Sequence, residues 1–589
     1  HADAIFGGGG ILAGILPGYE TRESQLQGAR IVQRSIEMGE TGVLEAGTGV
    51  GKSLMYLMIA RAMGKRIIVS TSNRMLQMQL YRKDAPFVAQ IFPSKIALVQ
   101  GKSNFACMER AQADGEIKKV SKELHDWYWS TESGNTQEID FMVDHKEVEK
   151  ITVNESCTGR QCGFYADCFY FKNKQNVDNA DIVICNHMLL ALHQRYEKAH
   201  ILPSGGVVVI DEAHQFQNYV AKVLGEEVRM AGVRNMVDTV RKYDTNMLEI
   251  DPAFSRFEDE IFAFGTDTKD NEIAIKTERV LKHGQALALS VLGQVKNIWD
   301  INVKPETKDD KRAYNIARRI TVQADKLLQV SRATRPGYVR WLNRTEKCLY
   351  NLPLDVSDFI GNMCGFSKPA PVDRNSCAGC GKPLEINVAV LGEQGFHPEC
   401  VTTVDVFNDA EIIHYDEWAA LAEPAPVIER GSNVIFTSAT LGTPSLAPFM
   451  REHGVSHALQ AQLKSPFDYK NNSLLYLPGG DAPSAKAPEF LDYMVEQMSL
   501  LVHASKGGAF LLFTSNKALA HATEKLRKQF ERAGFPCYVQ GDGYTKLEIV
   551  NQMKAKGNGV LFATKSFFEG ADIQGDALRL VVIDKMPFP

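Results

Sequence analysis

The chain has 589 residues, of which 44% are hydrophobic and 23% charged, and its formal net charge at pH 7 is −5. This composition excludes fibrous and disordered proteins, and the length allows about three to five domains of ordinary size. The net charge excludes a generally basic protein, although a nucleic-acid binder with a locally basic channel remains compatible with it.

The sequence contains no apolar run long enough to span a membrane, and residues 1–20 lack the pattern of a signal peptide. We therefore expect a cytoplasmic protein without a membrane partner. Eleven cysteines in such a chain favour reduced thiols or metal ligands over disulfides.

Three side chains near the N-terminus can bind a nucleobase. Tyr19 offers a ring for stacking, and Arg22 and Gln25 offer polar groups that can read the edge of a base. Gln25 also begins a helical pattern that continues to about Met38. The two interpretations are an adenine pocket and an ordinary amphipathic helix start.

Residues 45–53, Glu-Ala-Gly-Thr-Gly-Val-Gly-Lys-Ser, are the motif around which the chain is organised. They lie between the apolar pair at 43–44 and a helical pattern over residues 53–63, which predicts a strand, a phosphate-binding loop and a helix. Ala46 replaces the first glycine of the usual pattern, so we interpret the motif as a variant of that loop.

The loop has the chemistry that triphosphate binding requires. Its glycines allow successive backbone N–H groups to point at phosphates, while Lys52 supplies a positive charge and Ser53 a hydroxyl ligand for Mg²⁺. The predicted binding residues of the loop are Gly47, Thr48, Gly49, Gly51, Lys52 and Ser53.

A β-rich run over residues 66–71 is followed directly by a polar helix start over residues 72–80. This alternation is typical of a parallel α/β sheet. Hydroxyl and amide groups at the end of such a strand can bind nucleic-acid phosphates.

Three cysteines, Cys157, Cys162 and Cys168, lie close together in the sequence, and Cys107 precedes them. The four thiolates can hold one iron–sulfur centre, and tetrahedral zinc is the chemical alternative. Four unrelated buried cysteines would not explain the tight spacing of three of them.

Strand patterns return at residues 180–190 and at residues 207–210, which precede Asp211, Glu212 and His214. Asp211, at a strand end, can hold Mg²⁺, and Glu212 can orient and deprotonate an attacking water. His214 is expected to link this site to neighbouring segments.

From about residue 220 to 430 charged segments with helical periodicity dominate, for example 271–295 and 310–332, and they predict a large helical insertion. A C-x2-C pair and an H-x2-C pair within it have the spacing of a small structural zinc site. The predicted zinc ligands are Cys377, Cys380, His397 and Cys400.

Strand patterns resume at residues 433–441, 507–516, 559–564 and 578–584. They predict a second α/β lobe that shares the nucleotide site. The fold class is therefore α/β, with two parallel-sheet lobes and an insertion.

The order of these motifs resembles that of superfamily 2 helicases of the DinG/XPD group, and bacterial DinG more than its eukaryotic relatives. The matching stretches are Tyr19 to Gln25, Ala46 to Ser53, Thr71 to Leu80, Gly101 to Cys107, the cysteine trio, Asn186-His187, Asp211 to His214, Ser438 to Thr440, Phe510 to Asn516 and Phe567 to Asp572.

The resemblance implies two RecA-like lobes, an iron–sulfur domain and a mainly helical arch that carries the zinc-type module 377–400. The implied boundaries are 1–105, 173–225 and 430–446 for the first lobe, 106–172 for the iron–sulfur domain, 226–429 for the arch and 447–589 for the second lobe.

The resemblance also implies roles for individual residues. Lys52, Ser53, Asp211 and Glu212 match the ATPase residues, with ATP and Mg²⁺ as ligands. The four cysteines at 107, 157, 162 and 168 match the ligands of a [4Fe–4S] cluster. The remaining matches are Thr71, Gln77 and the residues around Phe513-Thr514 for a single-stranded DNA path, and Glu569 and Asp572 for coupling the second lobe to nucleotide.

The activity implied is that of a monomeric, ATP-dependent 5′-to-3′ DNA helicase that acts on single strands, duplex junctions or R-loops. The family's last arginine motif is expected beyond the Pro-Phe-Pro at 587–589. The module at 377–400 resembles no part of ordinary DinG, and it indicates a relative of the DinG-like helicase of type IV CRISPR systems. An ATP-gated clamp that acts with an RNA-guided complex is the alternative.

Overall fold

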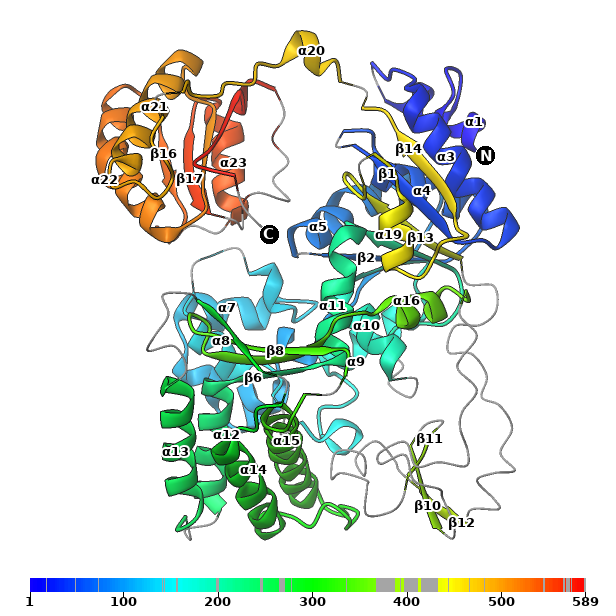
Figure 1. Cartoon of the computed structure of the whole chain (residues 1–589). Coiled ribbons are helices and arrows are strands. Elements are labelled where there is room, and N and C mark those ends of the chain that lie inside the picture. Colours follow the sequence, from blue (N-terminus) through cyan, green and yellow to red (C-terminus); the bar gives the residue numbers. More distant parts are fainter. Residues whose placement is uncertain are drawn as a thin grey trace. The chain divides into compact units, whose positions relative to one another are not determined.

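The computed structural model (Figure 1) describes residues 1–16, 18–47, 49–72, 74–139, 141, 143–154, 157–196, 201–243, 247–263, 271–276, 278–334, 336–366, 387–391, 394–396, 411–414, 433–442, 444–465, 467–480, 482–543, 546–564, 567, 573 and 575–586. Contacts divide the chain into two compact units. The first comprises His1–Ser72, Leu80–Ile139 and His145–Pro466, and the second comprises Asn73–Gln79, Asp140–Asp144 and Phe467–Pro589.

The first unit is built on a seven-stranded sheet in the order β14-β1-β13-β5-β2-β4-β3, in which every pairing is parallel. The strands are β1 (Gly42–Ala46), β2 (Ile67–Thr71), β3 (Ile96–Leu98), β4 (Ile182–Asn186), β5 (Val207–Asp211), β13 (Asn433–Ser438) and β14 (Leu459–Leu463). Buried runs of Val and Ile form its centre because helices cover both faces of a parallel sheet. The sheet extends to Leu463, past the expected end of the first lobe at residue 446.

Helices flank this sheet and form its core contacts. On one face, buried side chains of α10, α11, α16 and α19 join those of the central strands in a single cluster. The helices around the sheet are α3 (Glu23–Met38), α4 (Lys52–Ala62), α6 (Ala85–Ile91), α10 (His187–Arg195), α11 (Phe216–Leu224), α16 (Ser357–Met363) and α19 (Ala447–Glu452).

The cysteine-bearing region lies between β3 and β4 in the sequence and consists of short helices. Its chain is held together by isolated bridges from Phe105 to Asn135 and from Ala106 to Thr152. The α-helices of this region are α7 (Lys122–Ser130), α8 (His145–Ile151) and α9 (Phe169–Asp178).

The insertion after α11 is not purely helical. Four helices, α12 (Met230–Tyr243), α13 (Ile250–Ala263), α14 (Lys282–Gln294) and α15 (Lys308–Ser331), share one core with a four-stranded antiparallel sheet. The strands, in sheet order, are β6 (Glu226–Arg229), β9 (Cys348–Pro353), β8 (Tyr338–Asn343) and β7 (Glu272–Ile275). The expectation of a helix from residue 271 is therefore wrong for β7, which pairs with β8.

Beyond this sheet the structure describes a small antiparallel sheet of β10 (Asn387–Leu391), β11 (Gln394–Phe396) and β12 (Glu411–His414). The four predicted zinc ligands, Cys377, Cys380, His397 and Cys400, lie outside the described residues. The zinc site therefore stays a prediction.

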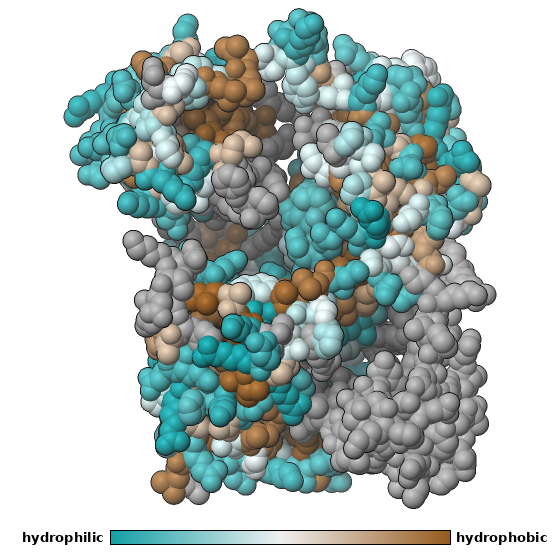
Figure 2. Space-filling model, in the orientation of Figure 1, coloured by the Kyte–Doolittle hydropathy of each residue, from teal (hydrophilic) through white to brown (hydrophobic). Residues whose placement is uncertain are grey.

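The second unit contains a parallel sheet in the order β16-β17-β15-β18, with α21 and α22 on one face and α23 on the other. Its elements are β15 (Ala509–Phe513), β16 (Cys537–Val539), β17 (Val560–Thr564), β18 (Leu580–Ile583), α21 (Phe490–Ser505), α22 (Asn516–Arg532) and α23 (Lys546–Lys556). Hydrophobic side chains gather on the face of this unit seen in Figure 2, and the exposed apolar residues of the unit include Leu474, Leu475, Leu477 and Met586. Glu569 and Asp572 lie outside the described residues.

None of the helices that the structure describes combines the length and the apolar character that a membrane span requires.

Candidate nucleotide-binding site

The phosphate-binding loop connects β1 to α4 at the carboxyl edge of the first sheet. Gly49 and Gly51 have φ angles of 79° and 87°, in the left-handed region that favours glycine. Lys52 begins α4, and its Nζ donates to the backbone oxygen of Ala46 at 3.1 Å, so the side chain folds back over the loop. Thr48 lies outside the described residues. The predicted strand, loop and helix are present in this order.

Two of the three predicted base-binding residues, Arg22 and Gln25, lie against this loop, and Tyr19 contacts Gln25. Arg22 Nη1 donates to the backbone oxygen of Gly49 at 2.8 Å. The Tyr19 hydroxyl lies 3.2 Å from Gln25 Oε1 and 3.0 Å from the backbone oxygen of Phe6. Gln25 in turn lies so close to Gly51 that a Cβ there would be 2.4 Å from its Nε2. The structure therefore brings the segment 19–25 and the phosphate-binding loop together in one region.

Asp211 ends β5 in a fully buried position beside the same helix. The hydroxyl of Tyr56, on α4, lies 3.3 Å from Asp211 Oδ2. Burial, with a smaller effect of Glu212, raises the pKa of the Asp211 carboxyl to about 7, while the positive charge of Lys52 opposes this shift. A buried carboxylate that needs a cation to stay ionised suits the predicted Mg²⁺ ligand, and Ser53 and Asp211 are the residues that would hold the ion.

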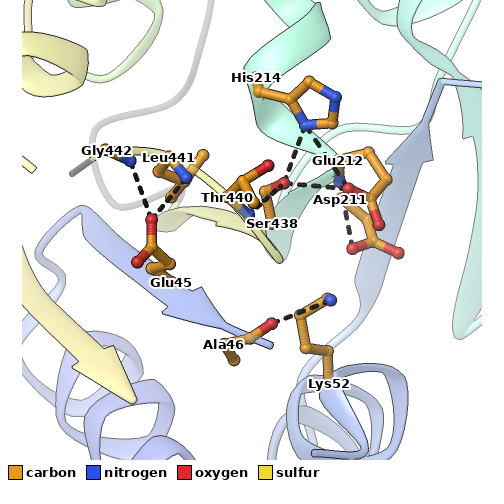
Figure 3. Close-up of polar contacts among 10 residues, drawn as sticks. All are labelled: Glu45, Ala46, Lys52, Asp211, Glu212, His214, Ser438, Thr440, Leu441 and Gly442. Atoms are coloured by element: carbon orange, nitrogen blue, oxygen red, sulfur yellow. Dashed lines mark hydrogen bonds and ion pairs between the residues drawn. The ribbon is translucent and has the colours of Figure 1, made fainter. Parts of the chain in front are cut away.

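Glu212 is held in a set position by three features. Its backbone has a φ of 56°, a left-handed conformation that is rare outside glycine. The Ser438 hydroxyl donates to Glu212 Oε2 at 2.9 Å and lies 2.8 Å from His214 Nδ1 (Figure 3). His214 Nδ1 is itself 3.5 Å from Glu212 Oε2. The end of β13 therefore fixes the predicted general base and its neighbouring histidine.

Two side chains at this edge were not predicted from the sequence, Glu45 and Tyr56. Glu45 lies within the motif stretch itself, just before the loop, and accepts hydrogen bonds from the segment after β13. Tyr56 follows Ser53 by one turn of α4, so helical periodicity could have placed it on the same face.

Three hydroxyls along the carboxyl edge of the first sheet are buried and have no hydrogen-bond partner among the described residues, those of Thr71, Ser72 and Thr437. Thr71 is a predicted DNA contact. Phe513 is different, because its side chain is fully buried and stacks on Phe562 in the core of the second unit. Phe513 is thus a packing residue, and only the residues after it stay candidates.

The four predicted cluster ligands lie in one region but do not form a closed metal site. Burial raises the pKa of the Cys107 thiol, and the neighbouring Cys157 and Cys168 add to this effect. Burial also raises the pKa of Cys162 to about 11. Within the described part of the chain, no three His, Cys, Asp or Glu side chains are placed to hold a metal ion.

This cysteine region is tied to α15 of the insertion. The Cys162 thiol donates to Glu109 Oε2 at 3.4 Å, and Arg312 Nη2 donates to Glu109 Oε1 at 2.8 Å. Asn315 Nδ2 donates to the backbone oxygen of Cys157 at 2.9 Å. The Glu109 side chain is only 8% exposed, so Arg312 supplies its charge partner in a protected position.

Comparisons with known proteins agree with this architecture. Residues 102–232 match the DEAD_2 family, and residues 498–589 match the helicase C-terminal domain family. The ATP-dependent DNA helicase YoaA of Escherichia coli K12 is 26% identical, over 98% of this chain and 84% of its own length. The ATP-dependent helicase DinG of Mycobacterium tuberculosis H37Rv is 25% identical, over 97% of this chain and 82% of its own length.

A solved structure of an XPD helicase has the same fold, with a TM-score of 0.50 and 13% identity over 96% of this chain and 85% of that one. Its likeness agrees with two parallel-sheet units of RecA-like type and an antiparallel insertion. The chain thus matches two helicase families over parts of its length, is similar to YoaA and DinG over nearly all of it, and shares the fold of an XPD helicase.

Proposed function

We propose that this protein is an ATP-dependent DNA helicase that moves 5′ to 3′ on single-stranded DNA and unwinds duplexes or R-loops. The observation that carries the proposal is the meeting of Lys52, Asp211 and Glu212 at one edge of one sheet, where the Lys52 charge acts on the Asp211 carboxyl. The relatives named as ATP-dependent DNA helicases support the choice of ATP and DNA.

The residues of this edge have separate tasks in ATP hydrolysis. The loop amides and Lys52 bind the β- and γ-phosphates, and Arg22 and Gln25, which lie against the loop, bind the base. Glu212 orients a water molecule and takes its proton, and Ser438 and His214 keep its carboxylate in place. Mg²⁺ held by Ser53 and Asp211 would neutralise phosphate charge.

The DNA strand is proposed to run along the carboxyl edge of the first sheet. The hydroxyls of Thr71, Ser72 and Thr437 support this path as polar groups at this edge without a partner among the described residues. All three side chains are buried, so the edge would have to open for a phosphate to reach them. Contacts of this kind bind phosphates rather than bases, so binding should be salt-dependent and weakly sequence-selective.

The experiment compares wild type with Lys52→Ala in two assays. In the first, single-stranded DNA should stimulate ATP hydrolysis by wild type and not by the variant; near-normal turnover by Lys52→Ala would refute the phosphate-loop assignment. In the second, wild type should displace a strand from 5′-tailed and not from 3′-tailed duplexes. Tight ATP-dependent DNA binding without displacement of either would support an ATP-gated clamp instead.

The two metal centres and the association with an RNA-guided complex stay predictions. The cysteines at 107, 157, 162 and 168 match family positions, but among the described residues they are not placed as a closed site, and the proposed ATP hydrolysis needs no cluster. The RNA-guided partner rests on the module at 377–400, whose cysteines and histidine lie outside the described residues.

A further inference from the structure

Glu45 joins three neighbouring strands at the edge that carries the phosphate loop. It lies on β1 in register with Ser438 of β13 on one side and Gln462 of β14 on the other. Its Oε2 accepts hydrogen bonds from the backbone N–H groups of Leu441 and Gly442 at 2.5 and 2.8 Å (Figure 3). Its Oε1 accepts one from Gln462 Nε2 at 3.2 Å.

The Glu45 carboxylate therefore binds one end of a short segment. The other end of this segment binds Glu212, the proposed general base. This segment, residues 438–442, begins with Ser438, whose hydroxyl bridges Glu212 and His214. It ends with Leu441 and Gly442 on Glu45. Gly442 also lies so close to Ser445 that a Cβ there would be 2.3 Å from the Ser445 backbone oxygen. The segment is therefore held at one end by Glu45 and at the other by Glu212 and His214.

Glu45 places a negative charge next to the loop that is proposed to bind phosphates. A negative charge directly before a phosphate-binding loop repels the phosphates unless nearby donors offset it. Here two backbone N–H groups and one amide offset the charge, and hydrogen bonds to an ionised acceptor are stronger than neutral ones. These contacts indicate that Glu45 serves to hold residues 438–442 in place beside the loop.

We infer that Glu45 is a positioning residue that sets the Ser438 hydroxyl between Glu212 and His214, and so links the phosphate loop to the general base. The inference rests on the proposed ATP hydrolysis. Loss of Glu45 should release Leu441 and Gly442, let Ser438 shift, and misplace Glu212, while leaving the loop amides and Lys52 able to bind nucleotide.

The test uses Glu45→Ala, Glu45→Gln, Ser438→Ala and the double variant Glu45→Ala/Ser438→Ala in the full chain. Binding of a fluorescent ATP analogue, DNA-stimulated kcat and the thermal unfolding midpoint are measured for each. Misplacement of a catalytic group by a small distance costs about tenfold to a hundredfold in rate, so kcat of Glu45→Ala should fall by that factor with Kd nearly unchanged. Glu45→Gln keeps the shape and one acceptor oxygen, and it should lie between wild type and Glu45→Ala.

If Glu45 acts through Ser438, the double variant should be no slower than the slower single variant. Gln460→Ala, at an exposed position of β14 in register with Val43 and not with Glu45, serves as the matched control and should keep its rate. Multiplicative losses in the double variant, or an unchanged kcat in both Glu45 variants, would overturn the inference. Wild type without ATPase activity would instead overturn the proposed function. If Glu45→Ala lowers the unfolding midpoint, the comparison is made with Glu45→Gln.

Discussion

His453 makes the stability of the first unit sensitive to pH in a way that can be measured. The residue follows α19, is 1% exposed, and stacks on Phe449 with ring centroids 3.9 Å apart. Its Nδ1 lies 2.9 Å from the Phe449 backbone oxygen. Burial lowers the pKa of this imidazole from 6.5 to about 4, because the charged form is poorly solvated among aromatic rings. Replacement by Phe removes the titrating group and keeps a ring in the cluster.

The size of the effect follows from the two pKa values. Between pH 6.5 and 4 the unfolded chain binds a proton at this position that the folded chain does not. Stability therefore falls as the pH falls through this window, by about 1.4 kcal/mol per pH unit. Lowering the pH from 7 to 5 should thus remove about 2 kcal/mol from the free energy of unfolding through His453 alone.

Urea unfolding of wild type, His453→Phe and His457→Gln at pH 7 and pH 5 tests this. His457 is a nearby exposed histidine, so its variant should keep the wild-type pH dependence. His453→Phe should lose about 2 kcal/mol less than wild type over the same change of pH. His187, whose pKa burial lowers to about 3, contributes equally to all three proteins. The same pH dependence in wild type and His453→Phe would refute the reasoning.

Three further predictions concern other contacts. Tyr56→Phe removes the hydroxyl that lies 3.3 Å from Asp211, and it should cost about 1 kcal/mol in urea unfolding; unchanged stability would contradict that hydrogen bond. Arg312→Met leaves the protected Glu109 carboxylate without its cation and should cost about 1 to 3 kcal/mol, since Arg312 is itself partly exposed. Adding Glu109→Gln should recover part of this loss, and no recovery would argue against the pair. Cys162→Ser should lower the iron content and visible absorbance of anaerobically purified protein, whereas a colourless wild type that contains only zinc would disprove an iron–sulfur centre.

The central strands of both sheets could be predicted from the sequence, whereas β14, at the edge of the first sheet, could not. β2 and β5 are runs of Ile and Val that lie buried on both faces, and this composition leaves few alternatives. β14 reads Leu-Gln-Ala-Gln-Leu and lies at the sheet edge, where half its side chains face water and no continuous apolar run is needed. The short alternating pattern of β7 does not predict a strand by itself. The segment becomes a strand because it pairs with β8.

The site residues that belong to a sequence motif with a known chemical role could be predicted. Lys52 and Glu212 follow a strand, Asp211 ends one, and each has the charge that its task requires. Glu45 could not be predicted, because its partners come from residues after β13 and from β14, which are distant in the sequence. These partners become neighbours of Glu45 only through the order of the strands in the sheet, and that order cannot be predicted from one sequence.

The position of β1 has a consequence for synthesis of the protein. Both neighbours of β1 in the sheet, β13 and β14, come after the whole insertion in the sequence. A ribosome-bound chain therefore exposes an unpaired β1, with its phosphate loop unsupported, until residues 433–463 have emerged. The proposed nucleotide site is therefore complete only late in translation, after the cysteine region and the insertion have been synthesised.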